Sequence, residues 1–254
     1  MLGQFVRDTV CRLYRPTITL TWIRKGQDSW MAHHLTSRTL PIRRDRRTTQ
    51  IERISVQNDD LGPQKIWQPY LQLEDYHGRS PQRMPSQVRS SPTMCSFFSH
   101  LVRVRKPEVV VEFGTAFGVS GMYWLSALED NHRGRLIGFE PNEGWAAVAE
   151  KNLAAVGSRF TLVRGTFEES IDAALKEGEK IDIALIDAIH TDTFVLPQFE
   201  MVVGRLAHGG LVLLDDIHFK GMNGCFERIA IDPRVASSAI LCDHVGIVEV
   251  RSQP

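Results

Sequence analysis

The alternation of apolar strands and amphipathic helices in the second half of the chain constrains its fold more than any other feature. Short β-branched segments recur from Glu108 onward, and each is followed by apolar residues at helical spacing. Strands are predicted over 108–113, 135–140, 160–164, 181–187 and 210–215. Helices are predicted between them over 118–128, 144–155, 168–176 and 192–206. Repeated strand–helix units predict a mostly parallel sheet covered by helices on both faces.

The end of the chain departs from this alternation. The apolar segments 239–242 and 245–251 are too close together for a helix between them, so they are predicted to pair as an antiparallel hairpin. We therefore predict an α/β fold with a doubly wound, mostly parallel, seven-stranded sheet. An antiparallel C-terminal hairpin and a helical or irregular N-terminal extension complete it.

The chain is predicted to divide into an extension over residues 1–92 and a main domain over 93–254. Residues 1–15 carry apolar residues at helical spacing, which favours a helix that docks on the main domain or on a partner subunit. A membrane-surface helix or a transit peptide fits less well, because Asp8 is unfavourable for both. Residues 58–93 are rich in turn signals and predict an irregular connection with short helices. The extension is thus a candidate lid or oligomerisation segment.

Charge is unevenly distributed along the 254 residues, although the net charge is zero. Residues 1–106 contain 18 Lys and Arg against 8 Asp and Glu, with the densest basic run at 43–47. We favour a solvated or inter-subunit surface over a nucleic-acid site, because no aromatic residues interleave with these arginines. No apolar run approaches the roughly 18 residues of a membrane span. The four cysteines are scattered, and a reducing, cytoplasmic setting is expected.

The turn after the first strand of the main domain is a candidate cofactor loop. Gly114 and Gly118 allow a tight turn and a close approach to a ligand, and their G-x-x-x-G spacing differs from the G-x-G-x-x-G of dinucleotide sites. Ligands in such sheets bind at the carboxyl ends of the strands. Glu140, at the end of the second strand, can accept hydrogen bonds from both hydroxyls of a ribose.

These features together resemble the class I S-adenosylmethionine-dependent methyltransferases, in particular the small-molecule O-methyltransferases. The resemblance covers about residues 92–219, and the hairpin extends it to the end of the chain. It implies that the loop 112–120 holds the methionine part of the cofactor, that Glu140 binds the ribose, and that the turn after the third strand flanks the adenine. The implied cofactor residues are Glu112, Gly114, Thr115, Gly118, Ser120, Glu140, Gly165, Thr166, Phe167 and Asp187.

Acidic and histidine side chains follow two neighbouring strands. Asp187 and His190 follow the fourth strand, whereas Asp215, Asp216 and His218 follow the fifth. Three adjacent carboxylates repel one another unless a proton or cation neutralises them, and a magnesium ion suits such oxygen ligands. In the metal-dependent O-methyltransferases the ligands fall at corresponding positions, so the resemblance implies that the three aspartates bind a divalent metal.

The catalytic roles remain open among three residues. A metal lowers the pKa of a bound hydroxyl, and His190 or His218 could accept its proton, since imidazole titrates near neutral pH. Asp187 is a candidate both for catalysis and for a hydrogen bond to the cofactor. In a purely structural interpretation, Asp216 caps a helix and His218 is a packed, hydrogen-bonded histidine.

The sequence therefore predicts an S-adenosylmethionine-dependent O-methyltransferase that modifies a hydroxyl of a small molecule with the assistance of a metal. This prediction has four alternatives. The first is a ribose methyltransferase of nucleic acid that uses the basic extension, and the second is a metal-independent enzyme with a histidine base. A non-enzymatic partner module and a dehydrogenase fit the motifs less well. Methylation of base nitrogens is disfavoured, because residues 187–190 lack the Asn/Asp-Pro-Pro-aromatic tetrapeptide.

A homo-oligomer is expected. The acceptor is unassigned, with the extension and aromatic residues such as Trp67 and Tyr70 as candidates to contact it.

Overall fold

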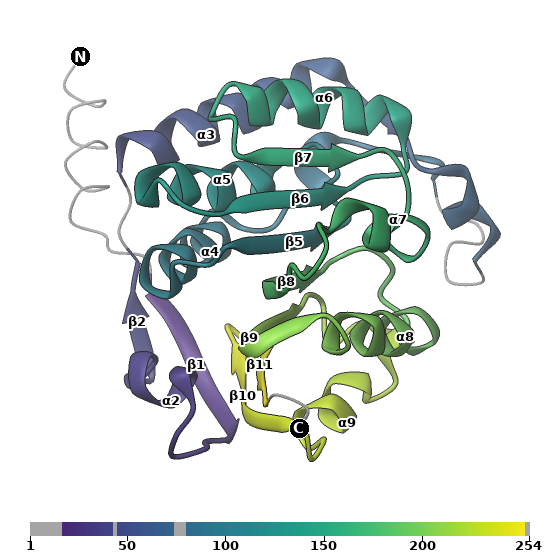
Figure 1. The fold of residues 1–254 in the computed structure, drawn as a ribbon. Helices are drawn as coiled ribbons and strands as arrows, with labels where there is room; N and C mark the ends of the chain where they lie inside the picture. The colour runs from purple at the N-terminus through teal and green to yellow at the C-terminus, as the bar shows by residue number, and fades with distance from the viewer. Residues whose placement is uncertain (1–16, 43–44, 74–79, 252–254) are drawn as a thin grey trace.

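The computed structural model describes residues 17–42, 45–73 and 80–251, and its centre is a nine-stranded sheet (Figure 1). The strand order is β2-β1-β10-β11-β9-β8-β5-β6-β7. Five strands pair in parallel: β5 (Val109–Phe113), β6 (Arg135–Phe139), β7 (Phe160–Val163), β8 (Ile181–Ile186) and β9 (Leu206–Leu214). These confirm the five predicted strands. The chain passes from β5 to β6 and β7 on one side and returns to β8 and β9 on the other, so the order of strands reverses beside β5.

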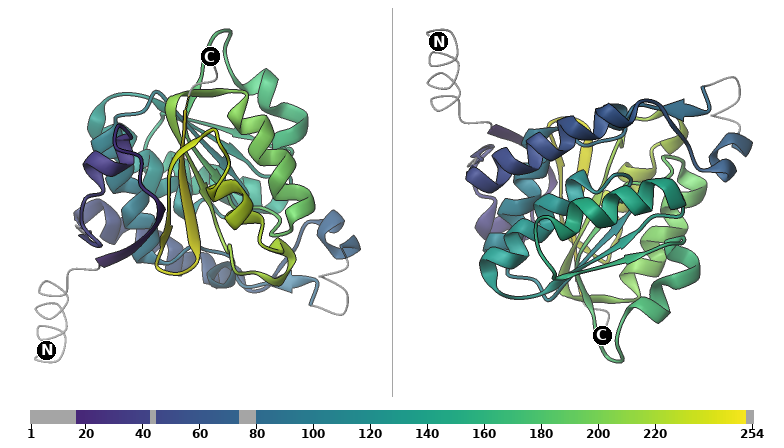
Figure 2. Two further views of the ribbon diagram at one scale, coloured as in Figure 1. Left: turned by 90° about the horizontal axis from the view of Figure 1, so that it is seen from below. Right: turned by 90° about the horizontal axis from the view of Figure 1, so that it is seen from above.

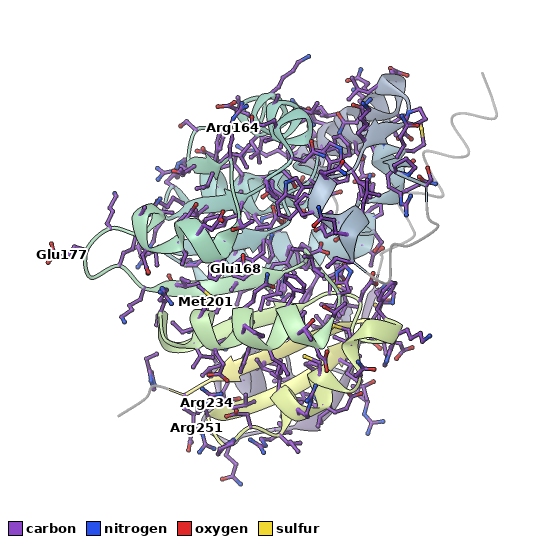
Figure 3. The ribbon with its side chains drawn as sticks, turned by 90° about the vertical axis from the view of Figure 1, so that its right-hand side faces the viewer. Arg164, Glu168, Glu177, Met201, Arg234 and Arg251 are labelled. Carbon is purple, nitrogen blue, oxygen red and sulfur yellow. The ribbon has the colours of Figure 1, made fainter. Side chains whose placement is uncertain are left out.

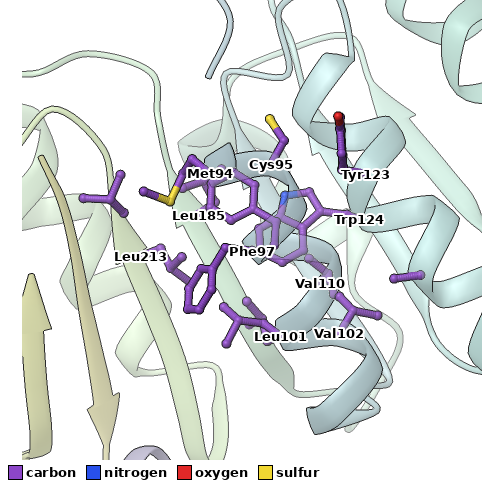
Figure 4. Close-up of a cluster of buried hydrophobic side chains, with 14 of the residues drawn as sticks. Met94, Cys95, Phe97, Leu101, Val102, Val110, Tyr123, Trp124, Leu185 and Leu213 are labelled. Carbon is purple, nitrogen blue, oxygen red and sulfur yellow. The ribbon is translucent and has the colours of Figure 1, made fainter. Parts of the chain in front are cut away.

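Helices cover both faces of the sheet, as the sequence predicted. One face is covered by α4 (Pro92–Arg105), α5 (Val119–Asn131) and α6 (Glu143–Ala154). The other is covered by α7 (Phe167–Ala174), α8 (Asp192–Val203) and α9 (Cys225–Ala230). Alternate side chains of a strand point to opposite faces, so Val110 packs with the first set and Val111 with the second. Figure 4 shows Phe97 and Leu101 of α4 beside Val110 and Leu213 of the sheet.

The C-terminal hairpin is present and joins the parallel strands. Strand β10 (Val235–Leu241) pairs with β11 (Val245–Val250), and β11 pairs with β9 in antiparallel register, Gly246 opposite Leu214. This register places the turn before β11 beside the end of β9.

The N-terminal extension corrects the predicted strand number from seven to nine. Strand β1 (Thr17–Arg24) pairs antiparallel with β10, and β2 (Thr39–Pro41) pairs with β1. In β1, exposed threonines alternate with the buried Ile18 and Leu20, which is the period-2 signal of a strand that the prediction of a helical or irregular extension missed.

Further contacts join the extension to the sheet. After β1 comes α2 (Trp30–His34), where the backbone amides of Trp30 and Met31 donate to the Glu249 carboxylate of β11 at 2.9 and 2.7 Å. Helix α3 (Arg46–Gln57) begins at an Asp45 cap and lies against α5 (Figure 2). The division of the chain at residue 92 stays a prediction, and side chains from both sides of it share one core.

Residues 58–73 and 80–91 form short elements, in agreement with the predicted irregular connection. They are η1 (Asn58–Leu61), β3 (Gln64–Lys65), η2 (Gln68–Gln72), β4 (Gln82–Arg83) and η4 (Pro85–Gln87), with β3 paired to β4. One further 3-10 turn, η5 (Lys220–Met222), follows β9. The predicted helix over 1–15 and the arginines at 43 and 44 lie outside the described residues.

Charged side chains such as Arg164, Glu177 and Arg251 project from the outer surface (Figure 3). Within residues 17–42, 45–73 and 80–251, no helix has the length and apolar character needed to cross a bilayer.

Candidate functional site

Two adjoining clefts lie where the carboxyl ends of the parallel strands meet residues 64–73 and 80–91. The first, which we call the acidic cleft, has a volume of about 340 Å³, and Asp187 and Asp215 are among its walls. The second, the aromatic cleft, has a volume of about 380 Å³, with Trp67 and Phe167 among its walls. The two clefts share Tyr70, Gly114, Glu140, Ala188 and Ile189. An extended ligand can therefore occupy both clefts and pass these shared residues.

Glu140, directly after β6, stands at the junction of the two clefts. Its side chain is buried, and its two oxygens accept hydrogen bonds from the backbone amides of Ala116 and Asn142, each at 2.8 Å. Burial raises the pKa of this carboxyl to about 7, although the two amides act in the opposite direction. Each carboxylate oxygen can accept a further hydrogen bond, and the predicted binding of a ribose diol by Glu140 stays a prediction.

The two glycines of the predicted cofactor loop have backbone reasons for their identity. Gly114 and Gly118 have φ values of +80° and +78°. A Cβ at Gly114 would lie 2.1 Å from the Asp187 carbonyl oxygen, and one at Gly118 would lie 3.1 Å from Cα of Ala149. Gly114 lines both clefts, whereas Gly118 lines neither. Gly118 thus allows α5 and α6 to pack closely, and Gly114 brings the end of β5 against the end of β8.

Glu112, Thr115 and Ser120 belong to the predicted cofactor loop but line neither of the two clefts. Glu112 is fully buried in β5, and its Oε1 accepts a hydrogen bond from the Trp124 indole at 3.1 Å. Burial raises the pKa of Glu112 to about 7, and the nearby hydroxyls and the indole partly oppose this shift. Thr115 and Ser120 line a third, small hollow at the start of α5. The structure therefore gathers these residues around the loop but not in the two clefts.

The predicted adenine-flanking turn lies in the aromatic cleft. Gly165, Thr166 and Phe167 connect β7 to α7, and all three line this cleft. The Phe167 ring stacks on Phe113 with 3.7 Å between ring centroids. A flat, apolar wall of this kind suits the face of a planar ring.

Asp187, His190 and Asp215 form a compact group within the described part of the chain. One ligand atom from each lies within 4.8 Å of the others, and His190 Nε2 is 3.3 Å from Asp187 Oδ1. Burial raises the pKa of Asp187 well above its usual range. Burial, followed by the charges of Asp187 and Asp216, raises the pKa of Asp215 to about 8. Carboxyls in this situation are stabilised by a proton or a cation between them.

The other two predicted residues at these strand ends are not members of the compact group. Asp216 lines the acidic cleft and borders the group, with a side chain that is 50% exposed and 3.8 Å from His190 Nδ1. Its φ of +49° lies in the left-handed region. His218 is exposed and lines neither cleft. His244, which the sequence analysis missed, lines the acidic cleft because the start of β11 lies beside the end of β9.

Residues 64–73 and 80–91 form a roof over both clefts. The Asn142 side chain donates to the Lys65 carbonyl, and the Tyr70 hydroxyl donates to the Ala188 carbonyl, both at 2.8 Å. Trp67 packs edge-on against the Tyr70 ring. The roof is thus attached to the ends of β6 and β8. No sequence motif marks these positions, and the only signal was the presence of aromatic residues in a polar segment.

Solved structures with the same fold include S-adenosylmethionine enzymes. The O-methyltransferase TomG from Streptomyces achromogenes, involved in tomaymycin synthesis and solved with SAM, has a TM-score of 0.58 and 15% identity over 83% of this chain and 92% of its own. An O-methyltransferase from Bacillus cereus in complex with SAH has a TM-score of 0.57 and 18% identity over 87% and 95%. At these identities the likeness concerns the fold.

Residues 111–217 match a family of methyltransferase domains. Over these residues the chain is similar in sequence to methyltransferase domains, and its fold is that of the solved methyltransferases. A Mycolicibacterium smegmatis protein provisionally named as an O-methyltransferase is 30% identical over 135 residues, 53% of this chain and 61% of that protein. A relative from Mycobacterium sp. strain JLS with the same provisional name is 29% identical over 149 residues, 58% and 64%. The chain thus spans about three fifths of the length of these curated relatives. The matched residues include the compact group of Asp187, His190 and Asp215 but not the roof.

Proposed function

We propose that this chain transfers a methyl group from S-adenosylmethionine to a hydroxyl oxygen of a small acceptor, with a divalent cation at the acidic cleft. The observation that carries the proposal is the arrangement of the clefts. Glu140 lines both, whereas the group of Asp187, His190 and Asp215 lines one end. A cofactor with its ribose at Glu140 would place its adenine in the aromatic cleft and its reactive end in the acidic cleft.

The cofactor fits the walls of both clefts. In this proposal Glu140 accepts hydrogen bonds from the ribose, Phe167 contacts the adenine, and the main chain at Gly114 shapes the path between the clefts. The cofactor supplies a methyl group on a positively charged sulfur. With the adenine in the aromatic cleft and the ribose at the shared residue Glu140, the methyl group would lie in the acidic cleft.

The compact acidic group fits a divalent cation. Asp187, Asp215 and His190 would hold it, in place of the three aspartates expected from the sequence. A bound cation lowers the pKa of an acceptor hydroxyl and fixes its position. Magnesium prefers oxygen ligands, so an imidazole in the set also favours Mn²⁺.

A metal-free mechanism is a second candidate, favoured by the 3.3 Å distance between His190 and Asp187. In that mechanism His190 accepts the hydroxyl proton while Asp187 orients the ring. The oxygen–carbon bond forms as the carbon–sulfur bond breaks, and the sulfur keeps the bonding electron pair. The two mechanisms differ in their response to a chelator.

The test measures labelled methyl transfer to a panel of small hydroxyl compounds, and Mn²⁺ binding by electron paramagnetic resonance. Asp215→Asn should weaken Mn²⁺ binding by roughly tenfold or more and abolish transfer. Asp216→Asn is the matched control and should change Mn²⁺ binding less, since its carboxylate lies outside the compact group. Full transfer in excess chelator would leave only the histidine mechanism. Binding of S-adenosylhomocysteine without transfer to any hydroxyl would refute the proposed reaction.

A further inference from the structure

The acidic cleft has opposite charges on its two sides. Asp187, Asp215 and Asp216 lie at the strand ends, whereas Arg83 and Arg89 come from the roof. The surroundings of the two arginines differ, and this difference bears on what the cleft can bind.

Arg89 is neutralised within the protein. Its guanidinium donates to both carboxylate oxygens of Glu52, at 2.8 and 3.0 Å, and also to the Ser55 hydroxyl. Its side chain is only 13% exposed. Arg89 also lines the small hollow beside Thr115, at the start of α5. It therefore holds the roof to α3 on the cofactor-loop side of the cleft.

Arg83 keeps its charge available to the cleft. It lies half-buried in β4, and its Nη1 donates to the carbonyl oxygens of Ser80 and Gln82, both at 2.9 Å. These main-chain contacts orient the guanidinium without cancelling its charge. Over the described ranges, no carboxylate lies within 4.0 Å of it; residues 74–79, which contain two acidic side chains, are outside those ranges. Arg83 lines the acidic cleft but neither the aromatic cleft nor the small hollow.

Arg83 lines the cleft that contains the acidic group and not the aromatic cleft proposed for the adenine. A ligand in the acidic cleft can therefore contact both the guanidinium and the strand-end carboxylates. Val88, Met94 and Phe219 add apolar side chains to the walls of the same cleft. The cleft thus combines a cationic group, apolar walls and the acidic group.

We infer that Arg83 is a specificity-determining residue that selects a hydroxylated aromatic acid as the acceptor. This inference rests on the proposed function. The acceptor carboxylate pairs with the Arg83 guanidinium, the ring contacts the apolar walls, and the hydroxyl lies at Asp187 and Asp215. A charge-assisted pair with the planar guanidinium contributes a roughly ten- to hundredfold preference over an uncharged analogue.

The test compares 3,4-dihydroxybenzoate with its methyl ester, which keeps the ring and hydroxyls but lacks the charge. Binding of each probe to the full chain, loaded with S-adenosylhomocysteine and Mn²⁺, is measured by calorimetry. The wild type should prefer the acid roughly ten- to hundredfold, and Arg83→Gln should bring the ratio close to one. Arg83→Lys should keep part of the preference, because a point charge lacks the bidentate geometry. Arg53→Gln, on the exposed side of α3, is the matched control and should leave the ratio unchanged.

The outcomes separate this inference from the proposed reaction. Equal binding of the two probes by the wild type, or no binding of the acid, overturns the role of Arg83. An unchanged ratio in Arg83→Gln with weakened S-adenosylhomocysteine binding also overturns it and assigns Arg83 to the cofactor. An Arg83-dependent preference for the acid without methyl transfer supports the inference and refutes the reaction.

Discussion

Binding of S-adenosylhomocysteine should depend on pH through Glu140. Burial raises the pKa of this carboxyl to about 7 in the protein without ligand. The ionised form accepts the ribose hydroxyls, so protonation and binding compete. If only the ionised form binds, its fraction falls from about nine tenths at pH 8 to about one tenth at pH 6, and the affinity falls about tenfold.

Glu140→Gln keeps the size of the side chain and removes its charge. Its affinity should be at least roughly tenfold below that of the wild type at pH 8, the loss expected when charge-assisted hydrogen bonds disappear. The affinity of this variant should also be nearly constant from pH 6 to 8. Glu143→Gln is a matched control, because Glu143 follows closely in the chain but is 71% exposed and pairs with Arg164.

Calorimetric titration at pH 6, 7 and 8, with chelator present, measures these affinities. Equal wild-type affinity at pH 6 and 8 would refute the reasoning. A Glu140→Gln protein that keeps the tenfold pH dependence would assign the titration to another group, such as Glu112.

Three further predictions test the buried groups and the roof. Glu112→Gln should flatten the pH dependence of the free energy of unfolding, measured by urea denaturation. Because the pKa of Glu112 is raised from 4.5 to about 7 in the folded protein, its contribution to stability is full below pH 4.5. About 3 kcal/mol of that contribution is lost as the pH rises through 7. An equally steep decline in the variant would contradict this. Gly114→Ala should destabilise the fold more than Gly178→Ala. Both glycines have positive φ, which costs alanine about 1–2 kcal/mol, but only a Cβ at position 114 would lie 2.1 Å from a backbone oxygen. Equal denaturation midpoints of the two variants would disprove the steric argument. Tyr70→Phe should weaken S-adenosylhomocysteine binding by about two- to tenfold through loss of the hydrogen bond to Ala188, and unchanged affinity would show that this bond does not support the clefts.

The parallel core could be predicted from the sequence because its signals are local. Segments such as 109–113 and 181–186 are short and β-branched, and the intervening helices show helical periodicity, so each element is recognisable without its neighbours. The location of Glu140, Asp187 and Asp215 at one rim also followed, since the carboxyl ends of parallel strands meet at the same edge. Strand β1 was missed, although its alternation is visible, because its pairing with β10 joins residues more than 200 positions apart.

Only the tertiary structure decided which side chains face one another at that rim. His190, and not the half-exposed Asp216, is the third member of the compact group with Asp187 and Asp215. His244 reaches the acidic cleft through the antiparallel register of β11 with β9, and Tyr70 reaches it through a hydrogen bond across 118 residues. Strand ends follow from local periodicity, but the direction of a side chain beyond a strand depends on backbone torsions and long-range packing that no local pattern contains.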